Sequence, residues 1–131
     1  MLQVDKIIVV ADHPLFRQAL LGTLKPKLSQ TQWLEAQSLA ELERLLAAHC
    51  DSDLLLLDLN IPGAHGFDTL IQVRSRFPHI PVVVISAYED HETINKAMTF
   101  GASGFIPKST SPQDIFNAIE QVLGGNIWLP D

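Results

Sequence analysis

Short β-branched runs alternate along this chain with stretches of helical period. The runs that predict strands are Lys6–Ala11, Gln32–Gln37, Asp53–Leu57, Pro81–Ile85 and Gly104–Ile106. Such alternation is typical of a parallel sheet that is covered by helices on both faces. Five strand-helix units in 131 residues predict a flavodoxin-like, doubly wound α/β fold. We expect five helices and a five-stranded parallel sheet of strand order 2-1-3-4-5.

The helical stretches carry apolar residues three and four positions apart. The clearest begins at Ser111 and Pro112, ends at Gly124-Gly125 and has the stripe Ile115, Ala118, Ile119, Val122 and Leu123. The stripes expected for the first three helices are Phe16, Ala19, Leu20 and Leu24; Leu39, Leu42, Leu45 and Leu46; and Phe67, Leu70 and Ile71. A fourth helix is expected around Glu92–Phe100.

Composition excludes several classes of partner and site for this domain. The apolar content of 47% suffices for one core, whereas a net charge of −6 and only nine Lys and Arg argue against direct binding of nucleic acid. Cys50 is the single cysteine, so a disulfide framework and a cysteine-rich metal site are excluded. The apolar run near the N-terminus is too short for a signal peptide or a membrane span. We therefore expect a cytoplasmic domain that does not contact a membrane.

Polar side chains follow four of the five predicted strands. They are Asp12, Asp58, Ser86 and Lys108. In an open α/β sheet ligands bind outside the carboxyl ends of the strands, near the point where the strand order reverses. Two carboxylates, a hydroxyl and an ammonium group at that edge suit phosphoryl transfer to a carboxylate.

Each of these residue types has a chemical reason. Asp12 and Asp58 would hold Mg²⁺, which favours one or two carboxylates, and the backbone carbonyl of Asn60 is a natural further ligand. Lys108 would pair with a phosphoryl oxygen, because a cation neutralises charge on the transferring group. Ser86 would donate a hydrogen bond to another oxygen.

Simpler explanations exist for single residues of this set. Asp12 before His13 and Pro14 could merely cap a helix, and Asp58 followed by Asn60 could belong to turn chemistry. A turn does not require a hydroxyl and an ammonium at the matching strand ends. The joint pattern therefore favours a phosphoryl site, with His13 expected close to it but without a chemical role.

Three segments resemble the core signatures of the receiver domains of two-component response regulators: "DLLLLDLNIPGAHGFDTL", "VVVISAYED" and "GASGFIPKS". The resemblance implies that Asp58 accepts a phosphoryl group from a histidine kinase or a small acyl phosphate. It also implies that Lys108 is the family's cation and Ser86 its switch hydroxyl. Beside Ser86, the small Ala87 would leave the acceptor accessible to a bulky donor.

Two aromatic residues acquire roles from the same resemblance. Phe105, three residues before Lys108, falls at the family's aromatic switch position. Tyr88, two residues after Ser86, falls where the family tunes the loss of its phosphoryl group, and its ring could shield an acyl phosphate from water. Phe105 by itself would suit a core position equally well.

The two ends of the chain, "VVADHPLFRQAL" and "IEQVLGGNIWLP", resemble the NarL/FixJ subset, in which a LuxR-type helix-turn-helix follows the receiver. The resemblance implies a receiver over residues 1–124 and the start of a linker at 125–131. DNA would be contacted only through a C-terminal domain beyond this chain, which we expect to be a fragment. The first and last helices offer candidate surfaces for a homodimer.

One position departs from the family pattern. Receivers usually carry two acidic residues after the first strand, and here the first of them is Ala11. One acid fewer predicts weaker Mg²⁺ binding and keeps open a phosphorylation-independent receiver that acts as a protein interaction module. An aspartyl-phosphate phosphatase is disfavoured, because Pro14 stands where the second acid of that class belongs. We therefore expect a regulatory domain and not an enzyme, beyond catalysis of its own phosphorylation and dephosphorylation.

Overall fold

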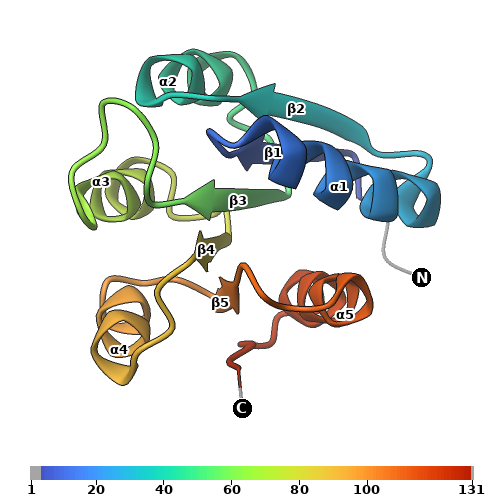
Figure 1. Cartoon of the computed structure of the whole chain (residues 1–131). Coiled ribbons are helices and arrows are strands. Elements are labelled where there is room, and N and C mark those ends of the chain that lie inside the picture. Colours follow the sequence, from blue (N-terminus) through green and yellow to red (C-terminus); the bar gives the residue numbers. More distant parts are fainter. Residues whose placement is uncertain (1–3, 131) are drawn as a thin grey trace.

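Five parallel strands form one sheet in the order β2-β1-β3-β4-β5 (Figure 1). The strands are β1 (Lys6–Val10), β2 (Gln32–Ala36), β3 (Leu54–Asp58), β4 (Val82–Ser86) and β5 (Gly104–Pro107). This computed structural model describes residues 4–130. The predicted fold and strand order are confirmed, although most strand ends lie one residue away from the predicted ones.

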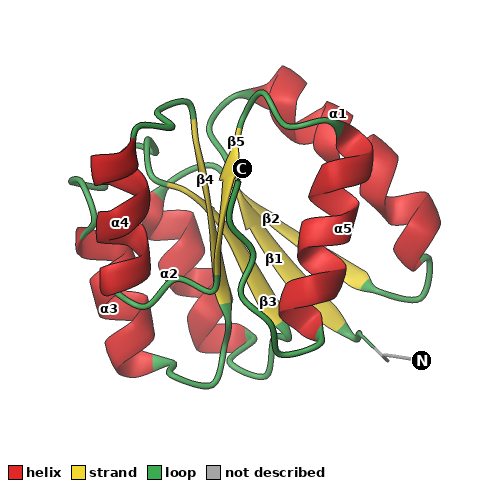
Figure 2. Cartoon of the chain, turned by 90° about the horizontal axis from the view of Figure 1, so that it is seen from below, coloured by secondary structure: helices red, strands yellow, loops and turns green. Residues whose placement is uncertain are grey.

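Helices cover both faces of the sheet. They are α1 (Pro14–Leu24), α2 (Leu39–Ala48), α3 (Asp68–Arg76), α4 (His91–Thr99) and α5 (Pro112–Leu123), with a 3₁₀ turn, η1 (Lys25–Leu28), after α1. Helices α1 and α5 lie on one face, and α2, α3 and α4 on the other (Figure 2). Within residues 4–130, no helix is long and apolar enough to cross a membrane.

The sheet is buried between two apolar layers. Every residue of β3 and β4 is buried, which explains their continuous apolar sequences, because a central parallel strand faces a helix layer on each side. Leu57 and Phe105 belong to the cluster under α2, α3 and α4, whereas Ile85 and Ile119 belong to the cluster under α1 and α5. The side chains of each strand therefore alternate between the two layers.

Polar side chains fix where three of the helices begin. The hydroxyl of Ser38 accepts a hydrogen bond from the backbone of Glu41, and Ser111 caps α5 in the same way, as predicted. Asp90 caps α4. Hydrogen bonds from the hydroxyl and the backbone of Thr93 lower the pKa of Asp90 below its ordinary value.

Two predicted helix stripes were wrong in part. Ala19 on α1 is exposed and Arg17 is buried, because Arg17 finds polar partners beneath the helix. Helix α3 begins only at Asp68, so its buried positions include Val73, while Ile71 is 40% exposed. Leu70 and Val73 lie three positions apart and share the buried face, whereas Ile71 lies about 100° further round the helix from Leu70.

The segment after α5 folds back onto the edge of the sheet. Gly125 turns the chain with φ +93, a backbone conformation that favours glycine. Trp128 then pairs in parallel with Gly104 of β5. The backbone N–H of Phe105 donates to the Trp128 carbonyl at 3.1 Å, and Trp128 N–H donates to Ser103 at 3.1 Å. The residues expected to begin a linker therefore border β5.

Candidate functional site

The strand ends bring Asp58 to the middle of one edge of the sheet. Asp58 is the last residue of β3, is fully buried, and is paired in register with Ile85 of β4. On the other side Leu57 pairs with Val10, which places Ala11 and Asp12 just beyond the end of β1. Three central strands thus deliver their polar ends to one place.

Lys108 follows β5, the edge strand two places from β3, and its side chain reaches the Asp58 carboxylate. Its ammonium nitrogen lies 2.7 Å from Oδ2 of Asp58, and the two side chains are 18% and 1% exposed. The backbone N–H of Asn60 donates to Oδ1 at 2.9 Å. Among residues 4–130, Oδ2 has no partner with hydrogen-bond geometry, so its contact with Lys108 is an ion pair without directional alignment. Asp58 therefore keeps an oxygen that can take another partner.

His13 contacts the same ammonium group. Its Nδ1 lies 3.2 Å from Nζ of Lys108, and the ring of Phe16 lies with its centroid 5.3 Å from that nitrogen. The sequence placed His13 near the site without a role. The contact itself could not be foreseen, because a strand-end position brings His13 and Lys108 to one edge of the sheet without fixing which side chains touch.

Ser86 and its neighbours occupy the end of β4. Ser86 is buried, and its Oγ accepts a hydrogen bond of 3.0 Å from the backbone N–H of Tyr88. Ala87 is exposed, and Tyr88 is 64% exposed. The hydroxyl is thus held by a local turn and the aromatic ring faces solvent. Their assigned roles stay predictions.

Phe105 lies entirely within the core. It is fully buried in the cluster under α2, α3 and α4, and it pairs in register with Val84. Its backbone also carries the hydrogen bond to Trp128. Phe105 therefore touches both the core beneath the acceptor strand and the C-terminal segment, while its action as a switch stays a prediction.

Arg17 holds the loop that carries Asp12, a role that was not among the predictions from the sequence. Nη1 of Arg17 donates to the carbonyl of Ala11 at 2.6 Å, and Nε donates to Glu35 at 3.1 Å. The guanidinium group is buried, which requires such partners. A signal was available, because Arg17 precedes Leu20 by three residues and Leu24 by seven, on the buried stripe of α1.

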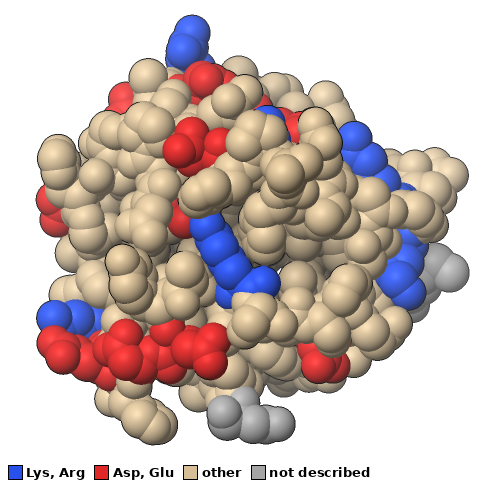
Figure 3. Space-filling view, in the orientation of Figure 1, with Lys and Arg blue, Asp and Glu red and all other residues tan. Residues whose placement is uncertain are grey.

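The donor set at this edge fits a magnesium ion. No three His, Cys, Asp or Glu side chains gather as metal ligands anywhere in the described part of the chain. Asp12 and Asp58 are the carboxylates at the strand ends, and Asp58 Oδ2 is a buried oxygen without a hydrogen bond from residues 4–130. Magnesium suits one or two carboxylates completed by carbonyl and water oxygens. In a space-filling view a basic side chain crosses a hollow near the centre, with acidic side chains close by (Figure 3).

Comparisons with known proteins agree with this geometry. Residues 7–120 match the sequence profile described as the response regulator receiver domain. The glycerol metabolism activator of Pseudomonas putida is 43% identical over 125 residues, 95% of this chain and 57% of that protein. The nitrate/nitrite response regulator protein NarL of Escherichia coli K12 is 32% identical, with the same coverage of 95% and 57%.

Solved structures show the same architecture. A LuxR family DNA-binding response regulator from Silicibacter pomeroyi superposes with a TM-score of 0.82 at 31% identity, over 97% of each chain. The present chain spans 57% of the length of the two curated relatives just described. The match therefore describes one part of each of those two proteins.

Proposed function

Because this chain belongs to the response regulator receiver domain family, we propose that Asp58 is phosphorylated by a histidine kinase and controls a transcriptional output. Receiver domains are regulatory, and this one would at most catalyse its own phosphorylation and dephosphorylation. The observation that carries the proposal is the buried Asp58 carboxylate held 2.7 Å from Lys108 at the carboxyl ends of the strands.

The transfer places a new bond on the acceptor. A carboxylate oxygen of Asp58 attacks the phosphorus of a phosphohistidine or an acyl phosphate, and a P–O bond forms. The bond from phosphorus to the donor breaks, and its electron pair leaves with the donor. Lys108, already beside Oδ2, then pairs with a phosphoryl oxygen through a charge-assisted hydrogen bond.

Asp12, Asp58 and the Asn60 carbonyl are the groups that would hold Mg²⁺. When bound, the ion supplies charge neutralisation for the phosphoryl oxygens. Arg17 supports this arrangement, because its hydrogen bond to the Ala11 carbonyl fixes the residue before Asp12.

The signal would leave the site through Ser86 and Phe105. On phosphorylation the Ser86 hydroxyl gives up its bond from Tyr88 N–H and donates to the phosphoryl group. Tyr88 would tune dephosphorylation, and Ala87 would keep the donor's path open. Because Phe105 N–H bonds to Trp128, a shift of β5 would reach the C-terminal segment.

The limits of the domain belong to the same proposal. The receiver would occupy residues 1–124, and residues 125–131 would begin a linker to a LuxR-type DNA-binding domain. A homodimer through α1 or α5 stays a prediction. The names of the relatives support a transcriptional output, since they include an activator and a DNA-binding response regulator.

Acetyl phosphate with Mg²⁺ tests the proposal directly. We expect the intact protein to gain the mass of one phosphoryl group, and Asp58→Asn to gain none. Asp51→Asn is the matched control, because it removes an exposed carboxylate elsewhere in the chain and should be phosphorylated normally. An adduct of equal size in Asp58→Asn would disprove the assignment of the acceptor.

A second function keeps the fold without regulated chemistry. Ala11 favours it, because the site has one acid fewer than the family pattern. Such a receiver would act by binding a protein partner whether or not a phosphoryl donor is present. A wild-type protein that gains no adduct at saturating acetyl phosphate and Mg²⁺ would favour this second function.

A further inference from the structure

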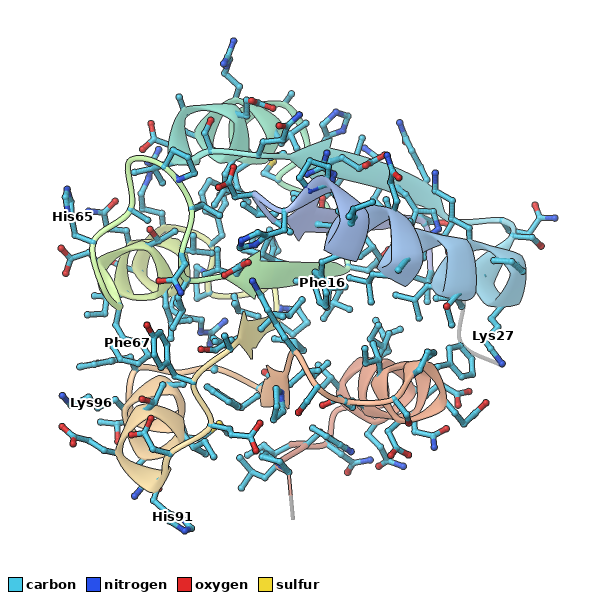
Figure 4. All side chains as sticks on the ribbon, in the orientation of Figure 1. Phe16, Lys27, His65, Phe67, His91 and Lys96 are labelled. Atoms are coloured by element: carbon cyan, nitrogen blue, oxygen red, sulfur yellow. The ribbon has the colours of Figure 1, made fainter. Side chains whose placement is uncertain are left out.

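Three groups surround the Lys108 ammonium. The Asp58 carboxylate lies at 2.7 Å, the Nδ1 of His13 at 3.2 Å and the centroid of the Phe16 ring at 5.3 Å. An ammonium group has three donors on a flexible four-carbon stem, so its position depends on the acceptors around it. Two of these three groups come from the start of α1. Figure 4 shows Phe16 extending from α1 towards the middle of this face.

Among the described residues, the contact with Lys108 is the only side-chain hydrogen bond of the His13 ring. His13 precedes Pro14, has extended backbone angles of φ −84 and ψ 108, and makes no side-chain cap for α1 among the described residues. Its side chain is exposed, whereas a ring with a packing role would be buried. The contact with Lys108 requires Nδ1 to be the acceptor nitrogen of a neutral imidazole, because the ammonium group can only donate.

We propose that His13 is a positioning residue that holds the Lys108 ammonium beside the acceptor carboxylate, with the Phe16 ring as a second support. This inference rests on the proposed phosphoacceptor function and adds a residue to it. His13 accepts one donor of Lys108, and Asp58 faces another, which leaves the third for a phosphoryl oxygen. Without His13 the stem can turn towards solvent, and the ammonium group is less often in place when a phosphoryl donor arrives.

Phosphorylation rates test this role. His13→Ala should lower the rate constant with acetyl phosphate about tenfold, the worth of one hydrogen bond to a charged group. His13→Asn keeps an acceptor oxygen close to the position of Nδ1 and should restore most of the rate. Phe16→Leu keeps apolar volume, loses the ring and should lower the rate about threefold. His91→Ala is the control, because His91 is exposed and points away from the site (Figure 4).

Accessibility of the Lys108 amine gives a second measurement that needs no phosphorylation. We expect brief acetylation with an N-hydroxysuccinimide ester, followed by peptide mass analysis, to label Lys108 several-fold faster in His13→Ala. His13→Asn should label at the wild-type rate. The melting temperature of His13→Asn should equal that of the wild type, because an exposed ring without a cap contributes little packing. That of His13→Ala should fall by at most a few degrees, as the pair of Lys108 with Asp58 weakens.

The outcomes separate this inference from the proposed function. Wild-type protein that takes no phosphoryl group, with faster Lys108 labelling in His13→Ala, would reject the phosphoacceptor function and keep the positioning contact. Normal phosphorylation and unchanged labelling in His13→Ala would reject the positioning role and keep the acceptor. A slower His13→Ala that His13→Asn fails to rescue would also overturn it, because the acceptor atom would then not matter.

Discussion

The two ends of the sheet carry the same kinds of charged residue in different surroundings. At the amino ends of the strands, Lys6 and Asp51 form an ion pair of 2.9 Å whose side chains are 23% and 68% exposed. At the carboxyl ends, Asp58 and Lys108 form a pair of 2.7 Å that is 1% and 18% exposed. The two pairs have nearly the same distance between nitrogen and oxygen, but the pair at the carboxyl ends is far more buried.

The carboxylates at the two ends also differ in what they bond. At the amino end, Oδ2 of Asp53 accepts hydrogen bonds from the backbone of Asp5 and Lys6, at 2.7 and 3.0 Å. These bonds fasten the start of β1 to the start of β3. Asp58 accepts only one such bond from residues 4–130, at Oδ1. Its Oδ2 faces the ammonium group of Lys108. The first carboxylate supports the fold, and the second stays available for chemistry.

The largest effect should follow from removing the cation at the carboxyl end. Lys108→Met keeps most of the stem but leaves the buried Asp58 carboxylate without a counter-charge, so we expect the free energy of unfolding to fall by about 3 kcal/mol. Urea denaturation measures it. Lys6→Met breaks the exposed pair and should barely move the midpoint. Equal losses in the two variants would contradict the importance of burial.

Asp53 should matter for stability and not for phosphorylation. Asp53→Ala removes the acceptor of two backbone N–H groups, and we expect a loss of about 2 kcal/mol. The folded variant should take a phosphoryl group from acetyl phosphate at the wild-type rate. Asp53→Asn keeps one oxygen acceptor and should lose less stability. A slower phosphorylation of folded Asp53→Ala would show that the two ends of the sheet are coupled.

Adding the second acid of the family pattern at position 11 should strengthen metal binding at the carboxyl ends of the strands. Ala11→Asp adds a carboxylate beside Asp12, and we expect Mg²⁺ affinity to rise about tenfold, measured by isothermal titration calorimetry. Without metal the same variant should melt at a lower temperature than Ala11→Asn, because carboxylates then repel one another. Equal Mg²⁺ affinity in the Asp and Asn variants would place residue 11 outside the metal site.

The smallest effect should be the pH dependence of the amino-end pair. The hydrogen bond from Lys6 lowers the pKa of Asp51 below its ordinary 3.8. Because the folded pKa is the lower one, the pair stabilises fully above the ordinary pKa and loses this contribution as the pH falls through the folded value. The small difference in melting temperature between wild type and Asp51→Asn at pH 7 should vanish well below pH 3.8.

The sequence by itself determined the order of the elements and the residues that end the strands. Buried parallel strands must be apolar along their length, so β3 and β4 could be located from their continuous apolar runs. A polar residue where such a strand ends lies at the carboxyl edge of the parallel sheet, however the helices pack. Asp58 and Lys108 were therefore predicted to meet, and they do.

Only the tertiary structure decided which side chains complete the surroundings of that pair. The contact of His13 with Lys108, the bond of Arg17 to the Ala11 carbonyl and the pairing of Trp128 with Gly104 each depend on how elements pack. A local pattern fixes the direction of a side chain relative to its own strand or helix. It does not fix the distance to a residue on another element, because packing of the whole core sets that distance.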